Sequence, residues 1–203
     1  MLLAWLSGAE AGAIALILLL AILADAVAGD PPWLYRALPH PVVALGKAIE
    51  GWERRLNRDG LDGGERFRNG LGLTVAVAGL AAAVGLLLQL VTDLLPLGWL
   101  LAALLASTLL SGRGLEEAVT AVAEALETGL ESGRAAVSKI VGRDPESLDE
   151  AGVARAATES LAENFSDGLV APAFWFLVAG LPGIAAYKAI NTLDSMIGHR
   201  SPR

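Results

Sequence analysis

Four stretches of this chain carry almost no charge, and they limit its possible folds more than any other feature. Residues 69–92, 94–112 and 168–187 are free of Asp, Glu, Lys and Arg. A fourth stretch, residues 11–29, contains only Asp25. A helix needs about 20 consecutive apolar residues to cross the hydrocarbon core of a bilayer. These lengths predict an integral membrane protein rather than a soluble globular one.

The composition supports this class and excludes several functions. Charged residues make up 18% of the 203 residues and hydrophobic residues 54%, whereas soluble domains have about 25% charged residues. The net charge of −7 predicts no nucleic-acid partner. Cysteine is absent, which excludes disulfides, thiolate metal ligands and a cysteine nucleophile. The two histidines cannot build a zinc centre by themselves.

We therefore predict an all-α, polytopic integral membrane protein with amphipathic cytoplasmic helices, in a single membrane-embedded domain over residues 1–203. The predicted membrane segments are three spans, at about 9–28, 70–92 and 94–111, and a broken hydrophobic segment at 168–187. The connections at 30–68 and 113–167 hold seven and five Lys or Arg residues. We expect the protein in the inner cell membrane. The positive-inside rule then places both connections in the cytoplasm.

The segment at 168–187 allows two topologies. Pro172, Gly180, Pro182 and Gly183 interrupt it, and broken backbone at membrane depth must be buried in protein or line a cavity. A straight crossing would carry everything after Lys188 to the outside. A re-entrant segment would keep that tail in the cytoplasm, and the periodicity does not decide between the two.

Two helices are expected in the second connection. Apolar residues at helical spacing predict an amphipathic helix over 114–140, in which Gly129 weakens the far end. Ser147 and Glu150 are spaced as a capping box, in which each side chain satisfies a free backbone N–H group of the other residue. We therefore expect a second helix from about residue 148 to residue 164.

An acidic stripe ends this second helix. Arg155, Glu159 and Glu163 recur every four residues and so share one helical face, and Asn164 and Asp167 follow at the membrane edge. Carboxylate and amide oxygens are hard ligands that suit Mg²⁺, which takes one or two carboxylates together with substrate phosphates. A helix surface held by salt bridges between residues four apart has the same spacing. The spacing leaves both interpretations open.

A second polar face follows the broken segment. Lys188, Asn191, Asp194 and Ser195 lie on one side of a helix. Polar groups next to a membrane segment are costly without partners and mark substrate or ion paths. Ser195 lacks the surroundings of a serine nucleophile.

Further candidates lie in the connections. Asp25 and Asp30 are either a cap at the end of the first helix or the second part of a site. His40 is either a hydrogen-bonded loop residue or a base. Arg143 lies in a turn, where its guanidinium can hold a carboxylate or phosphate through two hydrogen bonds.

Five ordered motifs from about residue 20 onward resemble the CbiB/CobD family, the adenosylcobinamide-phosphate synthases of cobalamin biosynthesis. They are Asp25…Gly29-Asp30-Pro31, Leu38-Pro39-His40-Pro41, Val141-Gly142-Arg143-Asp144, Glu159-Ser160-Leu161-Ala162-Glu163-Asn164…Asp167-Gly168 and Tyr187-Lys188-Ala189-Ile190-Asn191-Thr192-Leu193-Asp194-Ser195-Met196.

The resemblance implies a membrane enzyme that joins adenosylcobyric acid to aminopropanol, or to its phosphate, through an amide bond. The implied cofactors are ATP and Mg²⁺, and the implied partners are this corrinoid, the amine and membrane lipid. The resemblance implies roles for these residues: Glu159, Glu163 and Asp167 as metal ligands; Asp194, His40 and Lys188 as catalytic groups; Arg143, Asn164, Asn191, Asp30 and Ser195 as substrate-binding groups.

Members of that family continue beyond the last motif, and this chain lacks that C-terminal third. Two explanations stay open: a fragment of a longer protein, or a short protein that needs a partner chain. The expected partners are either further copies of this chain, in a homo-oligomer, or a chain that supplies the missing C-terminal part. Two other functions also stay open. One is a small membrane transporter or binding subunit, because half-helix ion sites use similarly broken segments. The other is a non-catalytic scaffold that gathers corrinoid enzymes at the membrane.

Overall fold

The computed structural model describes residues 8–31, 35–36, 40–142 and 144–198, and within these ranges the chain forms helices and no strand. In chain order the helices are α1 (Gly8–Ala28), α3 (Pro41–Leu56), α4 (Gly63–Leu94), α5 (Gly98–Ser107), α6 (Gly112–Thr128), α7 (Leu130–Val137), α8 (Glu150–Phe165), the π-helix η2 (Ser166–Val170) and α9 (Ala171–Ile197).

The described residues contain four helical segments long and apolar enough to cross a membrane. These are Ala11–Ala28, Gly63–Leu94, Gly98–Thr128 and Glu150–Ile197. Large apolar side chains such as Leu19, Val75 and Leu87 are more than half exposed on their outer surfaces. Because hydrocarbon solvates such side chains and water does not, the all-α, polytopic membrane architecture is confirmed.

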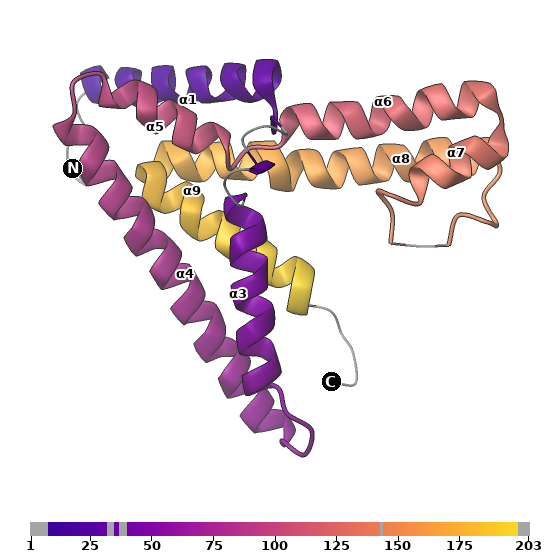
Figure 1. Cartoon of the computed structure of the whole chain (residues 1–203), viewed down its shortest axis with the longest axis horizontal. Coiled ribbons are helices and arrows are strands. Elements are labelled where there is room, and N and C mark those ends of the chain that lie inside the picture. Colours follow the sequence, from indigo (N-terminus) through magenta and orange to yellow (C-terminus); the bar gives the residue numbers. More distant parts are fainter. Residues whose placement is uncertain (1–7, 32–34, 37–39, 143, 199–203) are drawn as a thin grey trace.

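Three small cores of buried side chains hold together the helices whose arrangement Figure 1 shows. The first joins α1, α5 and the first part of α9 around Ala21, Ala106 and Phe176. Small residues on α5 let its backbone approach α1 closely. The second core joins α3, α4 and the last part of α9 around Ile49. The third joins α6, α7 and α8 into an arm that extends beyond the end of α1, around Val122.

The broken hydrophobic segment turns back on itself inside α9. Ala179 (φ −143°) and Gly180 (φ +63°) leave helical geometry, and the next backbone N–H, that of Leu181, donates to Oε1 of Gln89 on α4 at 3.3 Å. From the start of η2 to this break the helix rises only about 20 Å, short of a hydrocarbon core of about 30 Å. We call residues 168–187 the re-entrant segment, because the chain turns back within α9 and Tyr187, at the end of the segment, bonds to the Asp167 carbonyl just before its start.

Helix ends differ from the sequence predictions where caps decide them. The helix that contains the predicted span at about 70–92 begins at Gly63, because Asp62 and Glu65 form a capping box there. The predicted cap at Ser147 and Glu150 is wrong. Asp149 is the cap residue instead, because its Oδ1 accepts from the Gly152 N–H at 2.7 Å.

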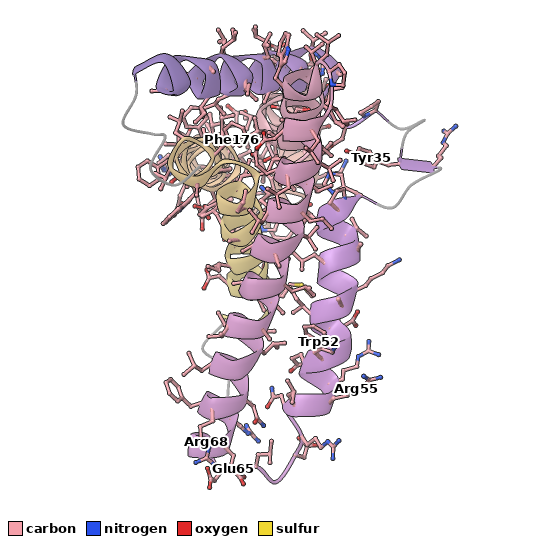
Figure 2. The ribbon with its side chains drawn as sticks, turned by 90° about the vertical axis from the view of Figure 1, so that its left-hand side faces the viewer. Tyr35, Trp52, Arg55, Glu65, Arg68 and Phe176 are labelled. Carbon is pink, nitrogen blue, oxygen red and sulfur yellow. The ribbon has the colours of Figure 1, made fainter. Side chains whose placement is uncertain are left out.

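Helix ends also fall inside two other predicted segments. The amphipathic helix over 114–140 divides into α6 and α7 because Gly129 adopts φ +139°, a conformation that glycine tolerates. The predicted span at 94–111 contains α5, which ends at Ser107 before the chain turns into α6. In Figure 2 the α3–α4 pair runs downward, and Arg55, Glu65 and Arg68 lie toward the lower end, where the two helices are connected.

Gly85 and Gly79 on α4 provide a matched test of the α4–α9 contact. A Cβ on Gly85 would lie 2.6 Å from the Leu181 carbonyl oxygen, whereas a Cβ on Gly79 would have no atom within 4 Å. We expect Gly85→Ala to lower the free energy of unfolding in detergent by roughly 1–3 kcal/mol through overpacking. Gly79→Ala should leave it unchanged or raise it slightly. Equal melting temperatures for the two variants would contradict this packing.

Candidate functional site

A polar cavity of about 460 Å³ lies where α8, η2 and the returning part of α9 meet. It collects side chains from two motifs that are separated in sequence by the whole re-entrant segment. Its lining residues are Ile140, Val141, Gly142, Ala156, Glu159, Ser160, Glu163, Asn164, Asp167, Asn191 and Ser195. Six of the residues predicted from the sequence therefore share one cavity.

Asp167 joins the two halves of this cavity. Its Oδ2 accepts a hydrogen bond from Asn191 Nδ2 at 3.1 Å, and its backbone carbonyl accepts one from the Tyr187 hydroxyl at 3.3 Å. Ser195, one turn after Asn191, donates its hydroxyl to the Asn191 carbonyl at 3.0 Å. The returning part of α9 is thus anchored directly to η2.

Ser160 and Asn164 form the wall of the cavity on α8. The buried Ser160 hydroxyl donates to the Ile140 carbonyl at 2.7 Å and so ties the segment before α8 to that helix. Asn164 Nδ2 donates to the Ser160 carbonyl at 2.9 Å. The sequence prediction missed Ser160 and Tyr187 as site residues, although both lie inside the motifs that it singled out.

The three predicted metal ligands open onto the cavity without forming a cage. Glu159 and Glu163 are exposed and Asp167 is half-buried. Among the residues that the structure describes, no three Asp, Glu or His side chains converge closely enough for a ready-made metal site. Arg155 lies 3.9 Å from Asp149 Oδ1.

Lys188 lies between this cavity and the lipid-facing helices. Its side chain is half-buried and lines a second, apolar cavity of about 310 Å³ between α3, α4, α5 and α9. The carboxylates of Asp167, Asp30 and Asp25 act electrostatically on its ammonium group. Its position is that of a lysine whose aliphatic stem covers apolar surface while its charge faces a polar region.

His40 and Asp30 form a separate pair. His40 Nδ1 accepts a hydrogen bond from the Val42 N–H at 3.2 Å and caps α3, so the ring proton of neutral His40 lies on Nε2, which is 3.3 Å from Asp30 Oδ1. The Tyr35 ring lies 4.6 Å from the His40 ring. Burial raises the pKa of the Tyr35 phenol, and Asp30 raises it further. The phenol therefore stays protonated at neutral pH.

Four of the predicted residues that the structure describes lie outside the cavity lining: Lys188, His40 and Asp30, described above, and Asp194. Asp194 is exposed on α9 and is not among the residues that line the cavity. Arg143 lies outside the described residues, although its neighbour Gly142 lines the cavity.

Comparison with known proteins agrees with this set of motifs. The family model described as CobD/Cbib protein matches residues 18–203. The chain belongs to this family. It is 55% identical over 192 residues to a Sinorhizobium protein named Cobalamin biosynthesis protein CobD. It is 54% identical over 190 residues to a protein of the same name from Brucella anthropi, and 49% identical over 193 residues to one from Rhodobacter capsulatus.

These alignments cover 93–94% of this chain but only 58–60% of the relatives. The chain thus spans about three fifths of the length of the curated CobD relatives that it matches. No solved structure matches the chain.

Ser160 and Ser138 provide a matched test of the cavity wall. Both hydroxyls donate to a carbonyl, but Ser138 bonds within its own turn to Ala135 at 2.9 Å, whereas Ser160 bonds across to Ile140. We expect Ser160→Ala to lower the free energy of unfolding by about 1–3 kcal/mol and to speed tryptic cleavage after the exposed Lys139. Ser138→Ala should change neither quantity. Equal cleavage rates in the two variants would contradict the assignment.

Proposed function

We propose that this chain acts in cobalamin biosynthesis as an ATP-dependent amide ligase, or as the N-terminal two-thirds of one. The proposed reaction joins adenosylcobyric acid to aminopropanol, or to its phosphate. Membership of the CobD/Cbib family supports the pathway, because the CobD relatives carry cobalamin biosynthesis in their names. The observation that carries the proposal is a polar cavity lined by residues of two motifs that are distant in sequence and that both resemble the family's motifs.

The donor atoms of this cavity fit a magnesium ion that arrives with a nucleotide. Mg²⁺ is usually held by one or two carboxylates and completes its shell with water and substrate phosphates. Glu159, Glu163 and Asp167 open onto one cavity, so each can offer carboxylate oxygens to such an ion. When bound there, Mg²⁺ would neutralise charge on the phosphoryl oxygens during activation of the corrin carboxylate.

The other polar groups take binding and proton-transfer roles. Asn164, Asn191 and Ser195 line the cavity and can hydrogen-bond the amine or its phosphate. Lys188 and Arg143 supply positive charge for carboxylate or phosphate oxygens, which cationic side chains bind strongly.

One of the two candidate bases is already engaged. His40 Nδ1 caps α3 and its Nε2 faces Asp30, so accepting a proton at Nδ1 would break the cap. Asp194 is exposed next to Ser195 on α9. His40 is therefore assigned to capping α3, with Asp30 beside its ring, and Asp194, next to the cavity-lining Ser195, is the remaining candidate for removal of the amine proton.

The placement of the break favours a ligase over a transporter. A transporter that uses half-helices holds its ion at the broken backbone near the bilayer midplane. Here the break at Ala179 and Gly180 is packed against Gln89 and Gly85. The polar cavity lies at the other end of the re-entrant segment.

A chimera that replaces the matching segment of the Sinorhizobium relative with this chain tests the proposal at full length. Membranes with the chimera should convert adenosylcobyric acid and aminopropanol, or its phosphate, to the amide only when ATP and Mg²⁺ are present. Substrate uptake into vesicles without amide formation would favour a transporter. Corrinoid binding with neither uptake nor amide formation would favour a scaffold.

Within that chimera, we expect Asp167→Asn to lower the rate of amide formation by on the order of 100-fold, because the cavity loses a charged oxygen ligand. Glu163→Gln should lower it as well. Glu124→Gln, an exposed acid on α6 away from the cavity, is the control and should leave turnover unchanged. Normal turnover in Asp167→Asn, measured by chromatography of the corrinoid products, would rule out this metal and substrate site.

A further inference from the structure

The junction between α5 and α6 is hydrogen-bonded to the π-helix η2, which carries Asp167. The Ser111 backbone N–H donates to the Gly168 carbonyl at 3.1 Å, and the Ser111 hydroxyl donates to the same carbonyl at 3.3 Å. Gly168 lies so close to Ser111 that a Cβ there would collide with its hydroxyl. The Gly168 carbonyl thus accepts two hydrogen bonds, and the backbone at Gly168 is in close contact with Ser111. Together these contacts fix the rotation of η2 at the residue next to Asp167.

The end of α1 holds this junction in turn. The Asp25 side chain is only 5% exposed, and its Oδ2 accepts from the Gly112 N–H at 2.8 Å and the Arg113 N–H at 3.4 Å. The first N–H groups of a helix have no partner within the helix and favour a negative charge. Asp25 therefore caps the start of α6 from the end of α1, whereas the sequence suggested a cap at the end of the first helix or the second part of a site.

Arg113, at the start of α6, in turn caps the C-terminal end of α1. Its Nη1 donates to the carbonyls of Ala26 at 3.0 Å and Val27 at 3.4 Å, which belong to the last turn of α1. Its side chain also packs over Gly29, which ends the helix at φ +53°. Each helix thus satisfies free backbone groups of the other. Figure 1 shows the end of α1 and the start of α6 meeting beside the junction of α8 and α9.

Because η2 is a π-helix, its hydrogen bonds to Ser111 affect the position of the Asp167 side chain. The Ala171 N–H bonds to the Ser166 carbonyl, five residues earlier, which shifts the helical register by one residue relative to an α-helix. Single π turns inside α-helices occur frequently at functional sites. Asp167 is therefore held on both flanks, by Ser111 through Gly168 on one side and by Asn191 on the other.

We propose that Ser111 and Asp25 are positioning residues for Asp167. Ser111 fixes the π turn directly, and Asp25 fixes Ser111 by capping the two residues that follow it. Neither side chain lines the polar cavity, so neither touches a substrate bound there. The predicted effect on catalysis rests on the proposed function, whereas the positioning itself does not.

A disulfide assay on the full chain in membranes measures the positioning without any substrate. The chain has no cysteine, so Asp167→Cys with Asn191→Cys introduces a single pair at side chains that meet at 3.1 Å in the native protein. Ser111→Ala and Asp25→Leu should each slow oxidation of this pair by about tenfold, the rate change expected when an ordering hydrogen bond is lost. Asp25→Asn, which keeps an acceptor oxygen, should restore most of the rate.

Two controls separate positioning from general loss of stability. Ser107→Ala removes a hydroxyl that bonds only within α5, to Leu104. Leu18→Ala removes a buried side chain from the α1–α5–α9 core. Both should leave the oxidation rate unchanged, although Leu18→Ala lowers the melting temperature. Unchanged oxidation in Ser111→Ala and Asp25→Leu, or equal slowing in Leu18→Ala, would overturn the proposal.

The catalytic consequence is tested separately, with native Asp167 in the chimera. Ser111→Ala should lower kcat for amide formation while the KM for the corrinoid stays unchanged, and Asp25→Asn should retain most of the kcat that Asp25→Leu loses. Slowed oxidation with an unchanged kcat would leave the positioning intact and would contradict the role of Asp167 in the proposed ligase. Normal oxidation together with a lowered kcat would contradict the positioning and leave the ligase proposal standing.

Discussion

The Leu181 backbone N–H donates to the Gln89 side chain at the break in α9, and the geometry of the whole site depends on this contact. An unsatisfied backbone group in hydrocarbon costs several kcal/mol, so a re-entrant turn needs a partner at membrane depth. Gly85 lets the α4 backbone reach the turn, and Gln89 is itself held by a hydrogen bond from its Nε2 to Asp93. Gly180 and Pro182 break the helix locally, and the contact with Gln89 satisfies the backbone N–H that the turn leaves free.

The turn brings together two polar motifs that flank an apolar segment. As a result, acidic oxygens from α8 and η2 face amide and hydroxyl groups from α9 across one cavity. The cavity is rich in negative charge, which suits a cation carried in with a phosphate. Lys188 and the Asp30–His40 pair extend this polar region toward the start of α3. A site at the edge of the bundle can receive water-soluble substrates while its scaffold stays in lipid.

Much of this arrangement could be predicted from single residues and their spacing. Lengths without charge predicted the membrane segments, and spacing of four residues placed Glu159 and Glu163 on one face of α8. The turn in α9 depends on Gln89, which is distant in sequence, so the periodicity of 168–187 could not choose between the two topologies. The π turn at Asp167 is set by contacts from Ser111 and Asn191, which no local pattern encodes. Asp194 falls outside the cavity although it shares a helical face with Ser195.

The most direct test of the re-entrant segment is labelling of single cysteines in sealed vesicles with a membrane-impermeant maleimide. Glu163 and Ser195 are exposed at the two sides of the cavity, and Leu95 is exposed at the α4–α5 turn. Glu163→Cys and Ser195→Cys should react from one face of the membrane, and Leu95→Cys should react from the other. If Glu163→Cys and Ser195→Cys react from opposite faces, the segment crosses the membrane and the shared cavity does not exist.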